Sequence, residues 1–169
     1  MRIFRFFILV LGLAALSACG SSSKFRTYNG PEVTQIVVFK GERTMHLMHH
    51  RKRLKSYKFD LGFAPVGHKQ FEGDGKTPEG VYFIDRRNPE SRFHLSIGLS
   101  YPNERDRAFA EAMGQKPGGD IFIHGRGPFY NLKKNRKPDW TWGCISVSDR
   151  EMEEIYSMVA TGTQIVVMP

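Results

Sequence analysis

The sequence predicts a mainly β domain of the α+β class, with one or two helices packed against the strands. Short segments rich in β-branched and aromatic residues recur along the chain, and glycine-containing turns separate them. One segment near the end has the start signal and the period of a helix. Residues 33–169 contain no internal repeat and no linker, so they are expected to form one domain with its own core.

The expected strands are short and are joined by turns. A strong turn signal covers residues 73–80, and a segment of helix-forming composition, residues 103–113, ends at Gly114. A polar and basic loop is expected over residues 126–139. The expected strands cover residues 33–39, 44–49, 54–63, 81–85, 93–99, 120–125 and 164–168.

The best-defined element is a helix that begins after Ser148. Ser148 and Glu151 have the spacing of a capping box, in which the side chain of each residue bonds the backbone N–H of the other. Thr161-Gly162 then ends the helix. Apolar side chains recur between these limits at the helical period, at Met152, Ile155, Tyr156 and Val159.

The first nineteen residues resemble a bacterial export signal. Arg2 and Arg5 precede the apolar run of residues 6–16, which is too short for a comfortable membrane span. Leu16-Ser17-Ala18-Cys19 resembles a lipobox, in which cleavage before the cysteine is followed by lipidation of its sulfur. Plain secretion would also require small residues here, but not a cysteine.

This resemblance divides the chain into three parts. Residues 1–18 are expected to form a lipoprotein signal peptide, residues 19–32 a lipidated Cys19 with a flexible tether, and residues 33–169 the domain. Gly20 after the cysteine resembles the signal for sorting to the outer membrane. The domain is therefore expected on the periplasmic face of the cell envelope, anchored to the membrane by lipid.

The chain is basic, and cleavage of its first residues changes this little. The formal net charge falls from +8 to +6, because Arg2 and Arg5 are removed. Nucleic-acid binding is one reading of such a charge, but an exported protein rarely meets nucleic acid, so no such partner is expected. Contact with anionic polymers of the envelope, or simple solvation of a basic loop, is favoured.

Cys144 is the only thiol that remains if Cys19 is acylated. An unpaired cysteine in an oxidising compartment is tolerated when it is buried or when it performs chemistry. Without further context, burial in the core would be favoured. The segments around His124 and Cys144 favour chemistry, because a cysteine nucleophile needs a base and backbone N–H groups for the oxyanion. Gly143 allows the tight turn that exposes such groups, although the spacing alone does not prove that the two segments meet.

These segments resemble the signature of the L,D-transpeptidase (YkuD-domain) family. That signature is a histidine, a spacer of about fourteen to seventeen residues, and then Ser/Thr-His-Gly-Cys. Here His124 is followed by residues 125–140 and then by Thr141-Trp142-Gly143-Cys144. The likeness includes the segments 73–80 and 99–103 and extends over residues 33–169. It implies an L,D-transpeptidase-type β-sandwich or barrel whose substrates are peptidoglycan stem peptides.

The resemblance also implies roles for individual residues. Cys144 would attack the carbonyl of the third residue of a stem tetrapeptide, release the terminal D-alanine and form a thioester, which an amine or water resolves. His124 would take the thiol proton, and Thr141 would support the pair by hydrogen bonding. The N–H groups of Gly143 and Cys144 would help to form the oxyanion hole. No metal and no organic cofactor is implied.

Two departures from the family pattern concern substrate binding. Trp142 stands where the family usually has histidine, and an indole cannot accept a proton, so His124 is the only base in the motif. Ser146 stands where the family usually has arginine, and Arg126 could replace that charge from the other side of the cleft. Tyr101 could line the pocket, or it could pack beside Pro102.

Other histidines are less informative. His46, His49 and His50 have a spacing that could suggest a metal site, but solvated histidines are favoured because their segment is basic. The predicted function is therefore that of a peptidoglycan L,D-transpeptidase. Two alternatives stay open: a hydrolase of the same fold, acting on peptidoglycan or on wall-linked lipoproteins, and a non-catalytic wall-binding lipoprotein.

Overall fold

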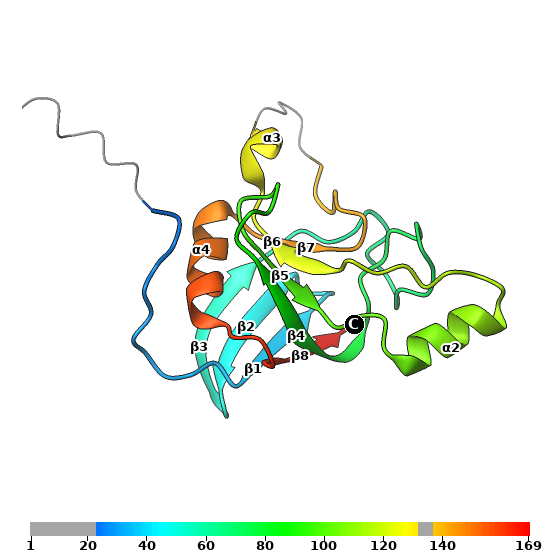
Figure 1. Cartoon of the computed structure of the whole chain (residues 1–169), viewed down its shortest axis with the longest axis horizontal. Coiled ribbons are helices and arrows are strands. Elements are labelled where there is room, and N and C mark those ends of the chain that lie inside the picture. Colours follow the sequence, from blue (N-terminus) through cyan, green and yellow to red (C-terminus); the bar gives the residue numbers. More distant parts are fainter. Residues whose placement is uncertain (1–22, 132–136) are drawn as a thin grey trace, which may run out of the picture.

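The structure is a computed structural model that describes residues 23–131 and 137–169. Eight strands form one mixed sheet in the order β3-β2-β1-β8-β4-β5-β6-β7 (Figure 1). This arrangement confirms the mainly β class. The strands are β1 Gln35–Phe39, β2 Thr44–His49, β3 Lys52–Lys58, β4 Gly80–Asn88, β5 Ser96–Leu99, β6 Phe122–His124, β7 Ile145–Ser146 and β8 Gln164–Met168. The helices are α2 Glu104–Ala112, α3 Gly127–Asn131 and α4 Asp149–Met158.

The last strand of the chain joins the two halves of the sheet. Strand β8 pairs in parallel with β1 and antiparallel with β4. Strand β4 continues to β5, and its register shifts between Ile84 and Arg86, where an irregularity of this kind bends a strand. Beyond it, β5 pairs antiparallel with β6, and β6 pairs in parallel with β7. The sheet therefore curls, and its short strands β6 and β7 form one edge.

The core lies between the sheet and α4. Burial alternates along β1 and β8, with Ile36, Val38, Ile165 and Val167 on the inner face, as a period of two requires. Helix α4 contacts β5 and β6 and crosses the sheet (Figure 1). Its predicted start is confirmed, because the Ser148 side chain accepts from the N–H of Glu151 in a complete capping box. The predicted apolar stripe is buried at Met152 and Ile155.

The structure differs from the expected strands between residues 54 and 63. Strand β3 ends at Lys58, and beyond it the chain makes isolated bridges, Asp60 to Ser146 and Gly62 to Thr141. The N–H of Asp60 donates to the carbonyl of Ser146 at 2.9 Å, and the N–H of Ser146 donates back at 2.8 Å. The expected strand is therefore split, because its second part crosses over to the segment that carries Cys144.

The loop expected over residues 126–139 contains a short helix, α3. Its first turn is held by Asp149, whose carboxylate accepts from the N–H groups of Arg126 at 2.7 Å and Gly127 at 2.8 Å. Strand β5 begins later than expected, because His94 has a positive φ of 77° and interrupts the extended backbone. Strand β7, which was not expected, exists only through its pairing with β6.

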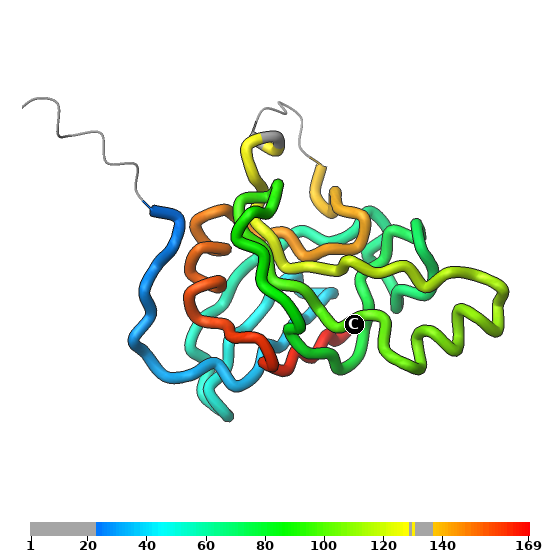
Figure 2. Tube along the Cα trace, in the orientation of Figure 1, coloured from blue at the N-terminus to red at the C-terminus, as the bar shows by residue number. Residues whose placement is uncertain are grey.

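The segment before β1 lies against the domain. Figure 2 shows its trace running beside α4. Lys24 Nζ donates to the carbonyl of Pro89 at 2.6 Å, and Arg26 forms an ion pair of 2.7 Å with Glu153 of α4. Contacts of the domain thus begin at Lys24, within the range expected to be a tether. The expected signal peptide and Cys19 lie outside the described residues, and within those residues no helix is long and apolar enough to cross a membrane.

Candidate active site

Cys144 and His124 lie on neighbouring strands at the same edge of the sheet. His124 is the last residue of β6, and Cys144 immediately precedes β7. The two strands are parallel, with Ile123 opposite Ile145 and His124 opposite Ser146. Residues opposite each other in a sheet point to the same face, so Ser146 and His124 share a face, and Cys144 lies two residues before Ser146. The topology therefore brings together the two segments that the sequence could not join.

The imidazole of His124 is buried and oriented by one hydrogen bond. Its Nδ1 lies 2.5 Å from the carbonyl oxygen of Gly125. A carbonyl oxygen can only accept, so Nδ1 carries the proton and Nε2 of the neutral ring carries the lone pair. Burial lowers the pKa of His124, and the Gly125 carbonyl and the Asp149 carboxylate oppose this shift. The ring therefore stays neutral at neutral pH, which is the form that can act as a base.

Aromatic side chains cover this imidazole. The ring of Phe93 stacks on it with a centroid distance of 4.5 Å, and Trp140 meets it edge-on at 5.8 Å. These rings exclude water from two sides of His124 and account for much of its desolvation. Phe93 and Trp140 also contact each other, with a centroid distance of 5.8 Å.

The thiol of Cys144 is partly exposed. Its sulfur donates to the carbonyl oxygen of Asp120 at 3.5 Å. Burial raises the pKa of Cys144, and the N–H of Phe122 opposes this shift. The resting thiol and the resting imidazole are therefore both neutral. The thiolate has to form by proton transfer as the sulfur attacks.

The loop before the nucleophile is held from within by Thr141. Its buried hydroxyl donates to the carbonyl of Cys144 at 2.6 Å and accepts from the N–H of Gly143 at 3.2 Å. The expected support by Thr141 thus reaches the main chain of the nucleophile. The Gly143 N–H is engaged in this long bond. It could bind an oxyanion only if it released the Thr141 hydroxyl and donated to the oxyanion instead.

Gly143 is required at its position. Its φ is 127°, and a Cβ there would lie 2.5 Å from the carbonyl oxygen of Lys76. Both the backbone conformation and the space exclude a side chain. The close neighbour belongs to the turn of residues 73–80, so this turn packs directly on the cysteine loop.

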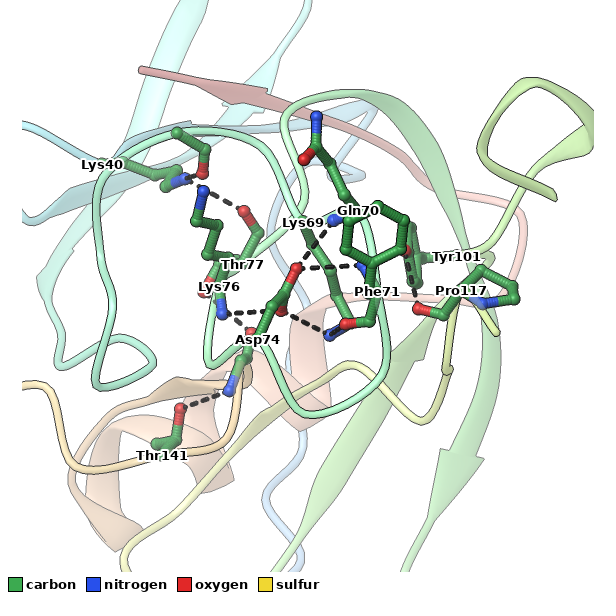
Figure 3. A network of polar contacts seen from close by, with 12 residues as sticks. Lys40, Lys69, Gln70, Phe71, Asp74, Lys76, Thr77, Tyr101, Pro117 and Thr141 are labelled. Carbon is green, nitrogen blue, oxygen red and sulfur yellow. Dashed lines mark hydrogen bonds and ion pairs between the residues drawn. The ribbon is translucent and has the colours of Figure 1, made fainter. Parts of the chain in front are cut away.

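That turn, which the sequence predicted over residues 73–80, is organised by the Asx-type hydrogen bonds of Asp74 (Figure 3). Its carboxylate accepts from Lys69 Nζ at 2.9 Å and from the N–H groups of Gln70, Phe71 and Lys76. Burial alone would raise the pKa of Asp74, but Lys69 and the three N–H groups lower it below its usual value. The carboxylate therefore remains charged and keeps the turn closed.

The turn then bonds to the cysteine loop through Thr77. Its hydroxyl donates to the carbonyl of Gly143 at 2.8 Å. On its other side, the buried Lys40 (Figure 3) donates to the carbonyl of Thr77 at 3.0 Å. Lys40 also donates to the carbonyl of Gly67 at 2.6 Å and pairs with Glu79 at 2.7 Å. The position of the nucleophile thus depends on a network that reaches back to the end of β1.

The three residues expected to bind substrate lie in different settings. Trp142 is 73% exposed beside the nucleophile and packs edge-on against Phe63, with a centroid distance of 5.1 Å. Arg126 follows the end of β6 by two residues, and its Nη2 lies 3.7 Å from Asp60 Oδ2. Tyr101 is buried, and its hydroxyl donates to the carbonyl of Pro117 at 3.0 Å (Figure 3). For Tyr101 the structure favours the packing role.

Sequence reasoning missed several residues of this site. Asp60, Phe93 and Asp149 belong to no motif, and they reach His124 or its neighbours only because strands from distant parts of the chain pair. Thr77 was part of the turn motif, but nothing in the sequence indicated its contact with Gly143. These four residues are found only once the sheet order is known.

Among the residues that the structure describes, no group of three or more His, Cys, Asp or Glu could hold a metal ion. His46 Nδ1 lies 2.9 Å from the hydroxyl of Ser56, and His49 Nδ1 lies 2.8 Å from the carbonyl of Glu32. A pocket of about 730 Å³ lies between α2, β4 and β8, and neither His124 nor Cys144 lines it.

A cysteine and a buried neutral histidine at the ends of adjacent parallel strands, with a glycine turn before the cysteine, are the residue types that nucleophilic catalysis by cysteine requires. The family model of the L,D-transpeptidase catalytic domain (YkuD) matches residues 33–167, and this chain belongs to that family. The resemblance expected from the motifs is thereby confirmed.

Relatives and solved structures agree with this assignment. The chain is 31% identical over 130 residues to "Putative L,D-transpeptidase YafK" of Escherichia coli (strain K12), covering 73% of this chain and 46% of that protein. The crystal structure of the helical cell shape determining protein Pgp2 from Campylobacter jejuni matches with a TM-score of 0.61 and 24% identity, over 88% of this chain and 51% of that one. An L,D-transpeptidase from Mycobacterium smegmatis matches with a TM-score of 0.53 and 14% identity, over 81% and 59% of the two chains. This chain thus spans about half the length of YafK and Pgp2.

Proposed function

We propose that this protein is a peptidoglycan L,D-transpeptidase that uses Cys144 as its nucleophile and His124 as its base. The observation that carries the proposal is the parallel register of β6 and β7, because Cys144 directly precedes the strand that pairs with the strand ending at His124. The second support is the tautomer of His124, whose Nδ1 bond to Gly125 leaves Nε2 free to accept a proton.

The reaction has two halves that use the same two groups. As the sulfur of Cys144 attacks the carbonyl of the third residue of a stem tetrapeptide, Nε2 of His124 takes the thiol proton. The Cys144 N–H stabilises the oxyanion, and Thr141 holds the carbonyl of the same residue. The imidazolium then protonates the amine of D-alanine, which leaves, and a thioester remains. An amine of a second stem attacks the thioester and loses its proton to His124, which restores the thiol.

A hydrolase would use the same first half, with water in place of the acceptor amine. Incubation with purified stem tetrapeptides, with and without an acceptor stem, separates the two reactions. Crosslinked dimers are expected from a transpeptidase, whereas cleavage without dimers would identify a hydrolase. The name of Pgp2 describes it as a cell shape determining protein, and we extend a role in wall shape to this chain as part of the proposal.

The nucleophile is tested by intact mass spectrometry after exposure to a carbapenem. A single stable adduct is expected on the wild-type chain, and none on the Cys144→Ala variant. His124→Gln should slow adduct formation by roughly two to four orders of magnitude, the usual contribution of a general base. A wild-type chain that forms no adduct and turns over no stem peptide would leave the non-catalytic wall-binding lipoprotein as the better account.

We also propose that the protein is anchored by lipid at Cys19 on the periplasmic face of the envelope, in the outer membrane. The support is the signal-like order of Arg2, the apolar run 6–16 and the lipobox-like residues 16–19. Labelled palmitate should be incorporated into the wild-type chain and not into Cys19→Ser. Membrane fractionation of the same two chains identifies the compartment.

A further inference from the structure

The turn that carries Phe93 to the candidate base has a strained backbone. His94 has a φ of 77°, and the N–H of Leu95 donates to the carbonyl of Phe93 at 3.0 Å, which closes a γ-turn over residues 93–95. A γ-turn with positive φ is the rare and strained form. Strain of this kind persists only where the surrounding structure holds it. The γ-turn therefore depends on contacts from other parts of the chain.

On its inner side, the γ-turn packs against the strand end that carries His124. The ring of Phe93 stacks on the imidazole with a centroid distance of 4.5 Å and an interplanar angle of 29°. The main chain is equally close, because a Cβ at Gly125 would lie 2.7 Å from the Phe93 carbonyl oxygen, and one at Gly127 would lie 2.9 Å from Phe93 Cα. The carbonyl of Gly125 is also the group that binds Nδ1 of His124. A displacement of the γ-turn would therefore change the surroundings of the imidazole.

On its outer side, the γ-turn is held by a carboxylate. Nε2 of His94 lies 2.9 Å from Oε1 of Glu153 on α4. Burial alone would raise the pKa of Glu153, but hydrogen bonds from Arg26 and His94 lower it below its usual value, so the group stays charged. A charged carboxylate can only accept, so Nε2 of His94 carries the proton of this bond. The side chain of the strained residue is thus fixed to a helix of the core.

The segment before β1, whose trace runs beside α4 (Figure 2), supplies two cations on this outer side. Arg26 donates from Nε at 3.0 Å and from Nη2 at 2.7 Å to Oε2 of Glu153, whose other oxygen bonds His94. Lys24 Nζ donates to the carbonyl of His94 at 3.3 Å and to that of Pro89 at 2.6 Å. A path of contacts therefore joins this segment to the γ-turn and, through the stacked ring, to the candidate base.

We propose that Lys24 and Arg26 are positioning residues for the candidate base. They hold the γ-turn from its outer side, and the γ-turn keeps the ring of Phe93 on the imidazole. The inference rests on the proposed function, in which His124 is the base. Both cations act through the γ-turn, since their bonds lie on the side that faces away from the imidazole. The segment that leads into the domain thus helps to set the properties of the site.

Release of the γ-turn should change a measurable property of His124. Burial lowers the pKa of His124, and the Asp149 carboxylate is the charged group that opposes this shift. If the γ-turn is no longer held, Phe93 moves away, water reaches one face of the ring, and the pKa rises toward 6.5. By linkage, the free energy with which the two cations hold the γ-turn limits this rise. Two partly exposed contacts allow an upward shift of roughly 0.3–1 pH unit.

The experiment is an NMR titration of His124 in the full-length protein and in the variant Lys24→Gln/Arg26→Gln. The pKa should be higher in the variant by roughly 0.3–1 pH unit. The ring protons of the neutral imidazole should also lose part of the upfield shift that a stacked aromatic face produces. Phe93→Ala sets the unstacked limit of both quantities. The acid limb of carbapenem acylation should move upward by the same amount as the pKa.

Two further variants separate the contacts from a general effect of charge. Lys52→Gln/Lys55→Gln also removes two positive charges and breaks the 2.6 Å ion pair of Lys55 with Glu154 on α4, and it should leave both quantities unchanged. Arg26→Lys should do the same, because one ammonium can bond the single oxygen of Glu153 that accepts both bonds from Arg26. Thermal unfolding verifies that each variant is folded. If the double variant does not fold, Arg26→Gln takes its place.

The outcomes separate this inference from the proposed function. Wild-type values in Lys24→Gln/Arg26→Gln, or equal changes in the two-lysine control, overturn the positioning role while the transpeptidase assignment stands. A higher pKa without a change in the ring-proton shifts is a direct effect of charge and also overturns it. If the protein forms no carbapenem adduct at any pH, the proposed function fails. The titration then still supports or overturns the hold on the imidazole, because it requires neither a nucleophile nor a substrate.

Discussion

The hydroxyl of Thr77 donates a hydrogen bond of 2.8 Å to the carbonyl oxygen of Gly143, the residue before the nucleophile. Both partners are buried in this contact. It links the turn organised by Asp74 to the loop that carries Cys144. The glycine-rich turn is therefore part of what positions the sulfur, although it contributes none of the proposed reacting groups.

Thr77→Val removes this bond and keeps the shape of the side chain. The Gly143 carbonyl then loses its partner, and the free energy of unfolding should fall by about 1–3 kcal/mol. Acylation by a carbapenem should slow by roughly tenfold or more, because the sulfur is less well positioned. Thr77→Ser is the matched control and should retain both properties. A valine variant that acylates at the wild-type rate would show that the contact is structural only.

Gly143→Ala should be far more harmful than the same change at Gly162. Both glycines have positive φ, 127° and 89°, but a Cβ at Gly143 meets the Lys76 carbonyl at 2.5 Å, whereas nothing lies within 4 Å at Gly162. Gly162→Ala should cost about 1–2 kcal/mol of backbone strain and leave acylation intact. Gly143→Ala should also displace the nucleophile and reduce acylation by roughly a hundredfold. Denaturant unfolding and adduct formation measure the two effects, and equal loss of acylation in both variants would contradict the argument.

The pH dependence of acylation should report the burial of His124. Burial lowers its pKa below the ordinary value of 6.5, so the rate should fall only when the pH drops below 6.5. Phe93→Ala exposes one face of the ring and should move this acid limb upward, toward 6.5. NMR titration of His124 in the two proteins gives the same quantity directly. An acid limb above 6.5 in the wild type would be inconsistent with a desolvated neutral base.

The lowered pKa of His124 also makes the free energy of unfolding depend on pH, and it fixes the direction of that dependence. Because the folded pKa of His124 is lowered, the unfolded chain binds the extra proton more readily. The contribution of His124 to the free energy of unfolding is fully present when the pH is above the pKa of this histidine in the unfolded chain. It is lost as the pH falls through the pKa that His124 has in the folded protein. His124→Gln should flatten this acid loss in a series of unfolding curves between neutral and acidic pH. If the slopes of the two proteins coincide, another group causes the acid loss.

Trp142→Ala should change substrate binding and little else. The side chain is 73% exposed and contacts Phe63, which is 51% exposed. Its removal should alter the free energy of unfolding by at most about 0.5 kcal/mol. If the indole holds the stem peptide, KM should rise with kcat unchanged, which is the signature of uniform binding. Met113→Ala, an exposed methionine after α2, is the control. An unchanged KM would remove Trp142 from the substrate-binding residues.

Local signals predicted the parts of the fold that local interactions build. The strands β1 and β8 and the capping box of α4 depend on a few adjacent residues each, and the sequence predicted them. The course of the chain after Lys58 was not, because Asp60 and Gly62 bond to Ser146 and Thr141, which are distant in the sequence. No periodicity within residues 54–63 could indicate that crossing.

The residues of the candidate site also fall into those that local motifs predicted and those that only the structure could show. Motif spacing indicated His124 and Cys144, and the sheet order explains why that spacing brings them to adjacent strands. Phe93 and Asp60 were missed, because the stacking of Phe93 on the imidazole and the bridge between Asp60 and Ser146 join residues that are distant in the sequence. The role of Tyr101 was left open between lining and packing, and its burial could be decided only by the structure.

The attachment of Lys24 and Arg26 to the domain limits how far the enzyme could travel from its anchor. With the lipid that we propose at Cys19, only the residues from 19 to 24 remain between the bilayer and the first fixed contact. A fully extended chain of that length spans about 17 Å. The catalytic edge would then act only on wall material within roughly one protein diameter of the membrane. A glycine-serine insert that lengthens the segment between Cys19 and Lys24 should extend the zone of wall that the protein can modify.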